Sequence, residues 1–183
     1  HKKYGAYLMP KRIENLKETI LQHARQILLE EGYGALTMRA VAARCGIAVG
    51  TVYNYFPAKD MMVGNVILAD WLETLGKMQQ ACSQAEDLRK GILCLYEELE
   101  EFSKVYWGTW TEYTFQGVRQ ADFAKRHRML VEQMAACLRP LLQRHHPNAP
   151  EKMDVFCVEN ILLCFNGSPM TITHFLSILA QML

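Results

Sequence analysis

The sequence lacks the short motifs that identify several large enzyme classes. It has no GxxxxGK phosphate loop, no GxSxG nucleophile elbow, no HExxH metal site and no second glycine-rich turn following a strand. We therefore predict that the chain is not an enzyme and requires no cofactor. Catalytic residues assembled from distant parts of the chain leave no such trace, so an enzyme remains the main competing class.

The chain also lacks any apolar run approaching the ~18 residues of a membrane span, and its first residues do not resemble a signal peptide. We expect a globular protein of the cytoplasm, with no membrane partner. Its 183 residues, half of them hydrophobic, suffice for one sizeable core or two small ones.

Cysteine and histidine patterns do not indicate metal sites or disulfides. The six cysteines form no CxxC pair and lie in apolar helical runs, which favours reduced, buried thiols. A redox sensor is the alternative, with Cys157 and Cys164 on one side of a helix but too far apart to bridge directly. His145 and His146 have no Cys or carboxylate partners at ligand spacing, so we predict turn residues and no metal.

Charge is divided unevenly along the chain. Residues 1 to 60 hold nine Lys and Arg against five Asp and Glu, whereas residues 61 to 183 hold eleven against fourteen. A basic N-terminal segment on an acidic body suits phosphate binding.

Apolar residues recur at spacings of three and four, and no strand pattern is convincing, which predicts an all-α fold. A helix from about Lys11 to Glu31 would end at Gly32 and Gly34. Later helices are predicted over about 59–80, 85–104, 122–144 and 151–166, with a further one after Pro169.

Residues Leu36 to Phe56, LTMRAVAARCGIAVGTVYNYF, predict a helix-turn-helix. Thr37 is a good N-cap for the first helix, Ala42 is small where two helices would cross, and Gly46 suits a left-handed turn. In such a unit the second helix lies in the DNA major groove. An ordinary helical corner of an all-α protein would show a similar turn pattern.

The residues that follow are more specific. Thr51 to Asp60, TVYNYFPAKD, resembles the GT-(V/L)-Y-x-(Y/H)-F-x-x-K-(D/E) signature of tetracycline-repressor-like (TetR-family) regulators, and the resemblance covers roughly residues 11 to 65. It implies that Gly50 and Thr51 open the recognition helix, that Tyr53 and Tyr55 reach phosphates, and that Lys59 contacts the DNA backbone. The chain departs from many members in having Ala48 and Val49 before Gly50, an apolar pair suited to thymine methyl groups.

The hypothesis is a ligand-responsive transcriptional regulator that binds a palindromic operator. We favour a repressor, with an activator as the alternative. The alternative is a helix-turn-helix adaptor that binds another protein and has no affinity for DNA. The candidate DNA-binding residues are Thr37, Arg39, Val49, Gly50, Thr51, Tyr53, Asn54, Tyr55 and Lys59.

An unusually aromatic stretch lies between Tyr106 and Phe115. In proteins that the chain resembles, this part contributes to an effector pocket, although large aromatics also fill ordinary cores. Glu112 would suit a cationic ligand among aromatic rings, or it is simply exposed. The candidate pocket residues for an unknown small-molecule effector are Trp71, Leu75, Trp107, Trp110, Glu112, Tyr113 and Phe123.

Two C-terminal helices carry more apolar surface than one core contact requires, which predicts a homodimer built on a four-helix interface. Both helices would otherwise belong to the core of one larger domain. The candidate interface residues are Leu130, Met134, Leu138, Leu141, Phe156 and Leu163. We predict a helix-turn-helix domain over residues 1–58 and an effector-binding and dimerisation domain over residues 59–183.

Overall fold

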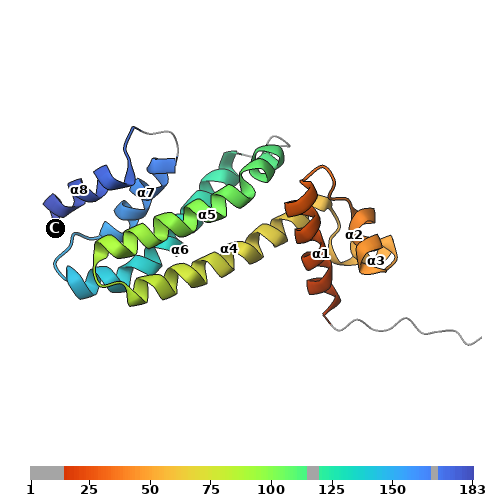
Figure 1. Ribbon diagram of the computed structural model, residues 1–183, viewed down its shortest axis with the longest axis horizontal. Coiled ribbons are helices and arrows are strands. Elements are labelled where there is room, and N and C mark those ends of the chain that lie inside the picture. Colours follow the sequence, from red (N-terminus) through yellow and green to blue (C-terminus); the bar gives the residue numbers. More distant parts are fainter. Residues whose placement is uncertain (1–14, 115–119, 166–168) are drawn as a thin grey trace, which may run out of the picture. The chain divides into compact units, whose positions relative to one another are not determined.

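The computed structural model describes residues 15–114, 120–165 and 169–183, and of residues 107–114 and 120–123 only the backbone (Figure 1). Within these ranges the chain forms helices and no strands, which confirms the predicted all-α class. The helices are α1 (Leu16–Glu31), α2 (Met38–Cys45), α3 (Val49–Tyr55), α4 (Lys59–Gln84), α5 (Leu88–Thr114), α6 (Gln120–His145), α7 (Met153–Phe165) and α8 (Ile172–Met182).

The chain divides into two compact units, residues 1–66 and 67–183. The division falls inside α4, which begins in the first unit and continues into the second. The boundary predicted from sequence, between residues 58 and 59, is where α4 starts. How the DNA-binding and effector-binding functions are divided along the chain stays a prediction.

The first unit is built on one face of α1. Ile20, Ala24, Ile27 and Leu28 recur at helical spacing and are at most 2% exposed. They cover a core to which α2, α3 and the start of α4 contribute Val41, Val52 and other buried side chains. Gly32, with φ of 87°, ends α1 as the sequence predicts. The predicted start of this helix at Lys11 lies outside the described residues.

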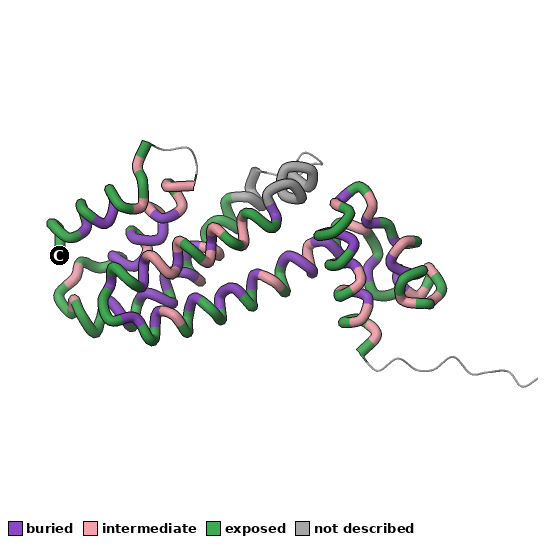
Figure 2. Tube along the Cα trace, in the orientation of Figure 1, coloured by how far each residue is buried: buried purple, intermediate pink, exposed green. Residues whose placement is uncertain are grey.

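The second unit packs α5, α6, α7, α8 and the remainder of α4 around one hydrophobic core. α6 contacts both α5 and α7, so two of its sides are buried. Buried residues accordingly recur along α5 and α6 in Figure 2. An ion pair adds to the α6–α7 contact, because Arg139 Nε donates to Oδ2 of the buried Asp154 at 2.8 Å.

Across the described residues, none of these helices is long and apolar enough to cross a membrane.

α5 and α6 approach closely at Gly91, which is buried. A Cβ built on Gly91 would overlap Cδ2 of Leu141, a side chain that is 1% exposed and therefore has little room to move. Gly76, in α4, is exposed, and a Cβ there would meet no atom within 4 Å.

This contrast defines a matched pair of variants. Both Gly91→Ala and Gly76→Ala gain the helix propensity of alanine, about 1 kcal/mol, but only the first overpacks the core. We expect Gly91→Ala to be about 1–3 kcal/mol less stable than Gly76→Ala in urea unfolding. Equal stabilities of the two variants would show that Leu141 repacks without cost.

Candidate nucleic-acid interface

Hydrogen bonds cap both ends of α2, and those at its C-terminal end form the turn into α3. At the start of α2, the Thr37 side-chain oxygen accepts a hydrogen bond from Ala40 N at 3.0 Å. At its end, Gly46 has φ of 66° and donates to Ala43 O at 3.2 Å, while Ile47 N donates to Ala42 O at 3.0 Å. This is a Schellman motif, which needs a left-handed residue and so favours glycine. The sequence prediction for Thr37 and Gly46 matches this geometry.

Buried residues set which face of α3 is outward. Val52 is fully buried and Phe56, directly after α3, is 1% exposed, so these two side chains fix the helix against the first unit. The opposite side carries the candidate residues. Gly50, Asn54, Tyr53 and Tyr55 are exposed, the two tyrosines by 50% and 42%, whereas Val49 and Thr51 are half-buried.

Two arginines near this face have different environments. Arg44 pairs with Glu31 and lies 3.8 Å from Glu30, so it links α2 to α1. Arg39 is exposed and forms no ion pair with any described residue. Arg39 is therefore the better of the two as a candidate phosphate contact.

Lys59 has a structural contact that the sequence did not reveal. Its Nζ donates to Tyr33 O at 2.6 Å and lies 3.6 Å from the centroid of the Tyr33 ring. The Tyr33 hydroxyl in turn donates to Asp60 Oδ1 at 2.7 Å. The first turn of α4 is thereby fastened to the loop between α1 and α2. Any contact of Lys59 with DNA has to be made beside this bond or in exchange for it.

The candidate effector residues are only partly described. Trp71 and Leu75 are 7% and 8% exposed and belong to the core of the second unit. The side chains of Trp107, Trp110, Glu112, Tyr113 and Phe123 lie outside the described residues.

Around Trp71 the structure brings together polar and aromatic groups that the sequence did not single out. Trp71 Nε1 donates to Gln133 Oε1 at 2.8 Å, and its ring meets Phe102 edge-on at 5.2 Å. The hydroxyl of Tyr106, which is 2% exposed, donates to Asp70 Oδ2. In the sequence, only the adjacency of Asp70 and Trp71 could have indicated this cluster. Nothing there places Gln133 opposite them.

The candidate dimer interface needs a correction. Met134, Leu138 and Leu141 are at most 1% exposed in a single chain, because α6 packs against both α5 and α7. They have no surface left for a partner. Leu130 is half-buried, and only Phe156 and Leu163 are exposed, by 40% and 47%.

The cysteines are free, and burial raises the pKa of all six thiols above 9.0. The pKa rises to about 12 for both Cys82 and Cys157, mainly because they are buried. Cys137 and Cys94 add to the rise for Cys82, and Asp154 adds to it for Cys157. Thiols of this kind are poor nucleophiles at neutral pH. Among the described residues no group of three His, Cys, Asp or Glu side chains is arranged to hold a metal.

Taken together, the capped turn and the outward face of α3 define a protein of the helix-turn-helix class. Residues 20–66 match the family model described as bacterial regulatory proteins of the tetR family. The first unit thus resembles the DNA-binding domain of the TetR family.

Related transcriptional regulators match mainly this first unit. The regulator UidR of Escherichia coli K12 is 33% identical over 61 residues, which cover 33% of this chain and 31% of UidR. The repressor KstR2 of Mycolicibacterium smegmatis is 31% identical over 97 residues, which cover 50% of this chain and 46% of KstR2. The chain thus matches less than half the length of either relative.

The likeness of fold extends further than the likeness of sequence. The solved structure of SCO7518 from Streptomyces coelicolor superposes with a TM-score of 0.58 over 91% of this chain and 96% of that one, at 15% identity. Such a low identity supports the fold alone, namely the helix-turn-helix followed by a helical second unit.

The raised thiol pKa values predict how the protein responds to alkali. A thiol whose pKa is higher in the folded state favours folding while it stays protonated, so stability should fall as pH rises from 9.0 towards 12. At pH 8 we expect iodoacetamide to modify the half-buried Cys45, Cys94 and Cys164 first, and Cys82 and Cys157 only after unfolding. Mass spectrometry of the folded and the guanidinium-unfolded protein measures this order. Rapid modification of Cys157 in the folded protein would instead support a redox sensor.

Proposed function

We propose that the chain is a ligand-responsive transcriptional repressor that binds a palindromic operator in duplex DNA as a homodimer. The observation that carries the proposal is the outward face of α3, whose exposed Tyr53, Asn54 and Tyr55 stand on a helix fixed by the buried Val52. In a helix-turn-helix this face enters the major groove.

The side chains of this face suit different parts of DNA. The tyrosine hydroxyls and the Arg39 guanidinium suit phosphate oxygens, which position the protein without reading sequence. Thr51 and Asn54 offer hydrogen bonds to base edges, and Val49 offers an apolar contact for thymine methyl groups. Sequence preference is therefore expected to rest on few side chains.

For the effector we propose a site in the second unit that includes Trp71 and Leu75 and extends to the aromatic residues of the α5 C-terminal part. Support comes from the cluster of Trp71, Phe102 and Tyr106 with the polar groups of Asp70 and Gln133. Small-molecule sites combine apolar walls with a few polar groups in this way. α4 supplies Asp70 and Trp71, and the same helix begins in the first unit, so it is the covalent path for coupling.

For dimerisation we propose the exposed apolar side chains of α7 and α8. Phe156 and Leu163 are seven residues apart, so they lie on one face of α7. On α8, Ile178 and Met182 are four residues apart and are 40% and 52% exposed. Two helices from each of two chains form a four-helix interface, and a dimer places two recognition helices on the two halves of a palindrome.

The first test is selection of random duplex DNA by the purified protein, followed by affinity for the best sequence across a salt series. We expect a palindrome to be enriched and its affinity to fall steeply with salt, since each phosphate contact contributes about 0.9 to the slope of log K against log salt.

The same operator then distinguishes phosphate contacts from base contacts. Lys59→Ala should weaken all sequences alike, while Thr51→Ala should change the ranking of sequences.

Because Lys59 also holds Tyr33, the variant has to be shown folded at the assay temperature. Lys77→Ala is the matched control, since Lys77 pairs with Glu73 at 3.2 Å in the second unit and should leave DNA affinity unchanged. Unchanged affinity of folded Lys59→Ala would reject its phosphate contact. Failure to enrich any sequence, with weak binding insensitive to salt, would favour the protein-binding adaptor.

The proposed dimer interface on α7 and α8 leads to a separate prediction. Leu163→Glu places a charge in the proposed apolar contact, so we expect it to convert the dimer to a monomer in sedimentation equilibrium. Leu29→Glu is the control, because Leu29 is similarly apolar and 38% exposed but lies on α1. A monomeric wild type, or a Leu163→Glu variant that stays dimeric, would place the interface elsewhere or remove it.

A further inference from the structure

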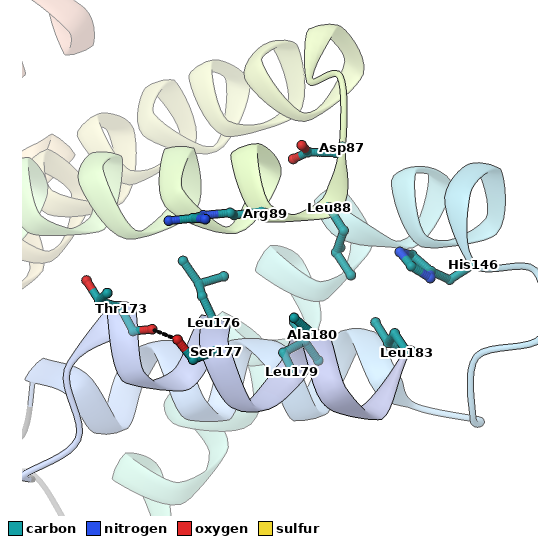
Figure 3. Close-up of a pocket in the computed structure, with 10 residues that line it drawn as sticks. All are labelled: Asp87, Leu88, Arg89, His146, Thr173, Leu176, Ser177, Leu179, Ala180 and Leu183. Atoms are coloured by element: carbon teal, nitrogen blue, oxygen red, sulfur yellow. Dashed lines mark hydrogen bonds between the residues drawn. The ribbon is translucent and has the colours of Figure 1, made fainter.

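A hollow lies in the second unit where the start of α5 meets α8, beside His146, which directly follows α6. Its volume is about 440 Å³, which falls within the ~300–1,000 Å³ typical of small-molecule sites (Figure 3). None of the residues that line it belongs to the proposed effector site around Trp71.

The floor of the hollow is apolar. Leu88 of α5 and Leu176 and Leu179 of α8 are 4%, 7% and 3% exposed and point between the two helices (Figure 3). The exposed Ala180 adds a small side chain at the edge, which leaves space above the leucines.

The rim carries one cation whose charge no described side chain neutralises. Arg89 is exposed and makes no ion pair with the described residues, whereas its neighbour Lys90 bonds Glu86 at 2.6 Å. The Asp87 carboxylate, which also lines the hollow, accepts from Lys90 N at 2.7 Å and so caps the first turn of α5.

Hydroxyl groups flank this cation. Figure 3 places Arg89 near Thr173 and Leu176, with His146 at the other end of the hollow. The Ser177 hydroxyl donates to Thr173 O at 3.1 Å, and the Thr173 hydroxyl stands on the exposed rim.

We propose that this hollow binds an amphipathic organic anion, a monocarboxylate with a short apolar tail. The carboxylate meets the Arg89 guanidinium at the Thr173 end, and the tail covers Leu176 and Leu179. A guanidinium forms charge-assisted hydrogen bonds with carboxylates, and the leucine floor gains from burial of the tail.

The dimensions favour a small molecule over a protein partner. A stable protein interface buries about 800 Å² on each side, and a helix is about 10 Å wide. This hollow is lined by α5, α8 and residues beside them, and it holds only about 440 Å³. The charge favours an anion over a cation, because the nearby carboxylate already caps α5.

Sodium octanoate and 1-octanol are suitable probes, since they differ mainly in the charged group. In calorimetric titration we expect the wild-type protein to prefer octanoate. Arg89→Gln should weaken octanoate binding about tenfold and remove its preference over octanol. Lys90→Gln, one residue away and outside the lining, is the matched control and should bind like the wild type.

A second variant tests whether the probes occupy the space above the apolar floor. Ala180→Trp should fill the hollow and abolish binding of both probes, and Ser177→Trp offers the same test if the first variant fails to fold. No binding of octanoate at millimolar concentration, or binding that all variants leave unchanged, would overturn the proposal. DNA affinity is a separate measurement, so failure of the proposed repressor function would not affect this result.

Discussion

Both units of the protein depend on burial of the same helix. α4 supplies Met62, Val63 and Val66, at most 1% exposed, to the first unit, and Trp71, Leu75 and Met78, at most 8% exposed, to the second. With 26 residues it is about 40 Å long at ~1.5 Å per residue. Each core therefore depends on the apolar residues of one part of α4, which is a single helix across the division between the units.

The first unit shows how closely folding and the proposed function share residues. Thr37 caps the start of α2 through its side-chain oxygen and Gly46 caps its end through the backbone, and the direction in which α3 leaves the turn follows from the Gly46 cap. Lys59 joins α4 to Tyr33 and is also the cation that the family signature assigns to DNA. A side chain already held in place loses less rotamer freedom on binding, which favours its use at an interface.

The sequence predicted the first unit well because its signals are local. A capping threonine, a glycine at a left-handed turn and buried positions at helical spacing are read within a few residues of each other. The second unit was harder, because both a core and a dimer interface bury apolar helices. The apolar residues of α6 therefore suggested an interface, although α5 and α7 cover Met134, Leu138 and Leu141. Pairs such as Trp71 with Gln133 join helices distant in sequence and leave no local pattern.

These distant pairs matter for how a ligand in the second unit would act. On α4, Asp70 bonds Tyr106 of α5 and Trp71 bonds Gln133 of α6, so adjacent residues fix the rotation of the helix from two directions. Loss of the Trp71–Gln133 bond without a replacement leaves the indole N–H of the buried Trp71 unsatisfied, which costs about 1–3 kcal/mol. Allosteric coupling free energies are of the same size, about 1–3 kcal/mol. Exchange of one bond for a bond to an effector is therefore enough, in magnitude, to shift the preferred rotation of α4.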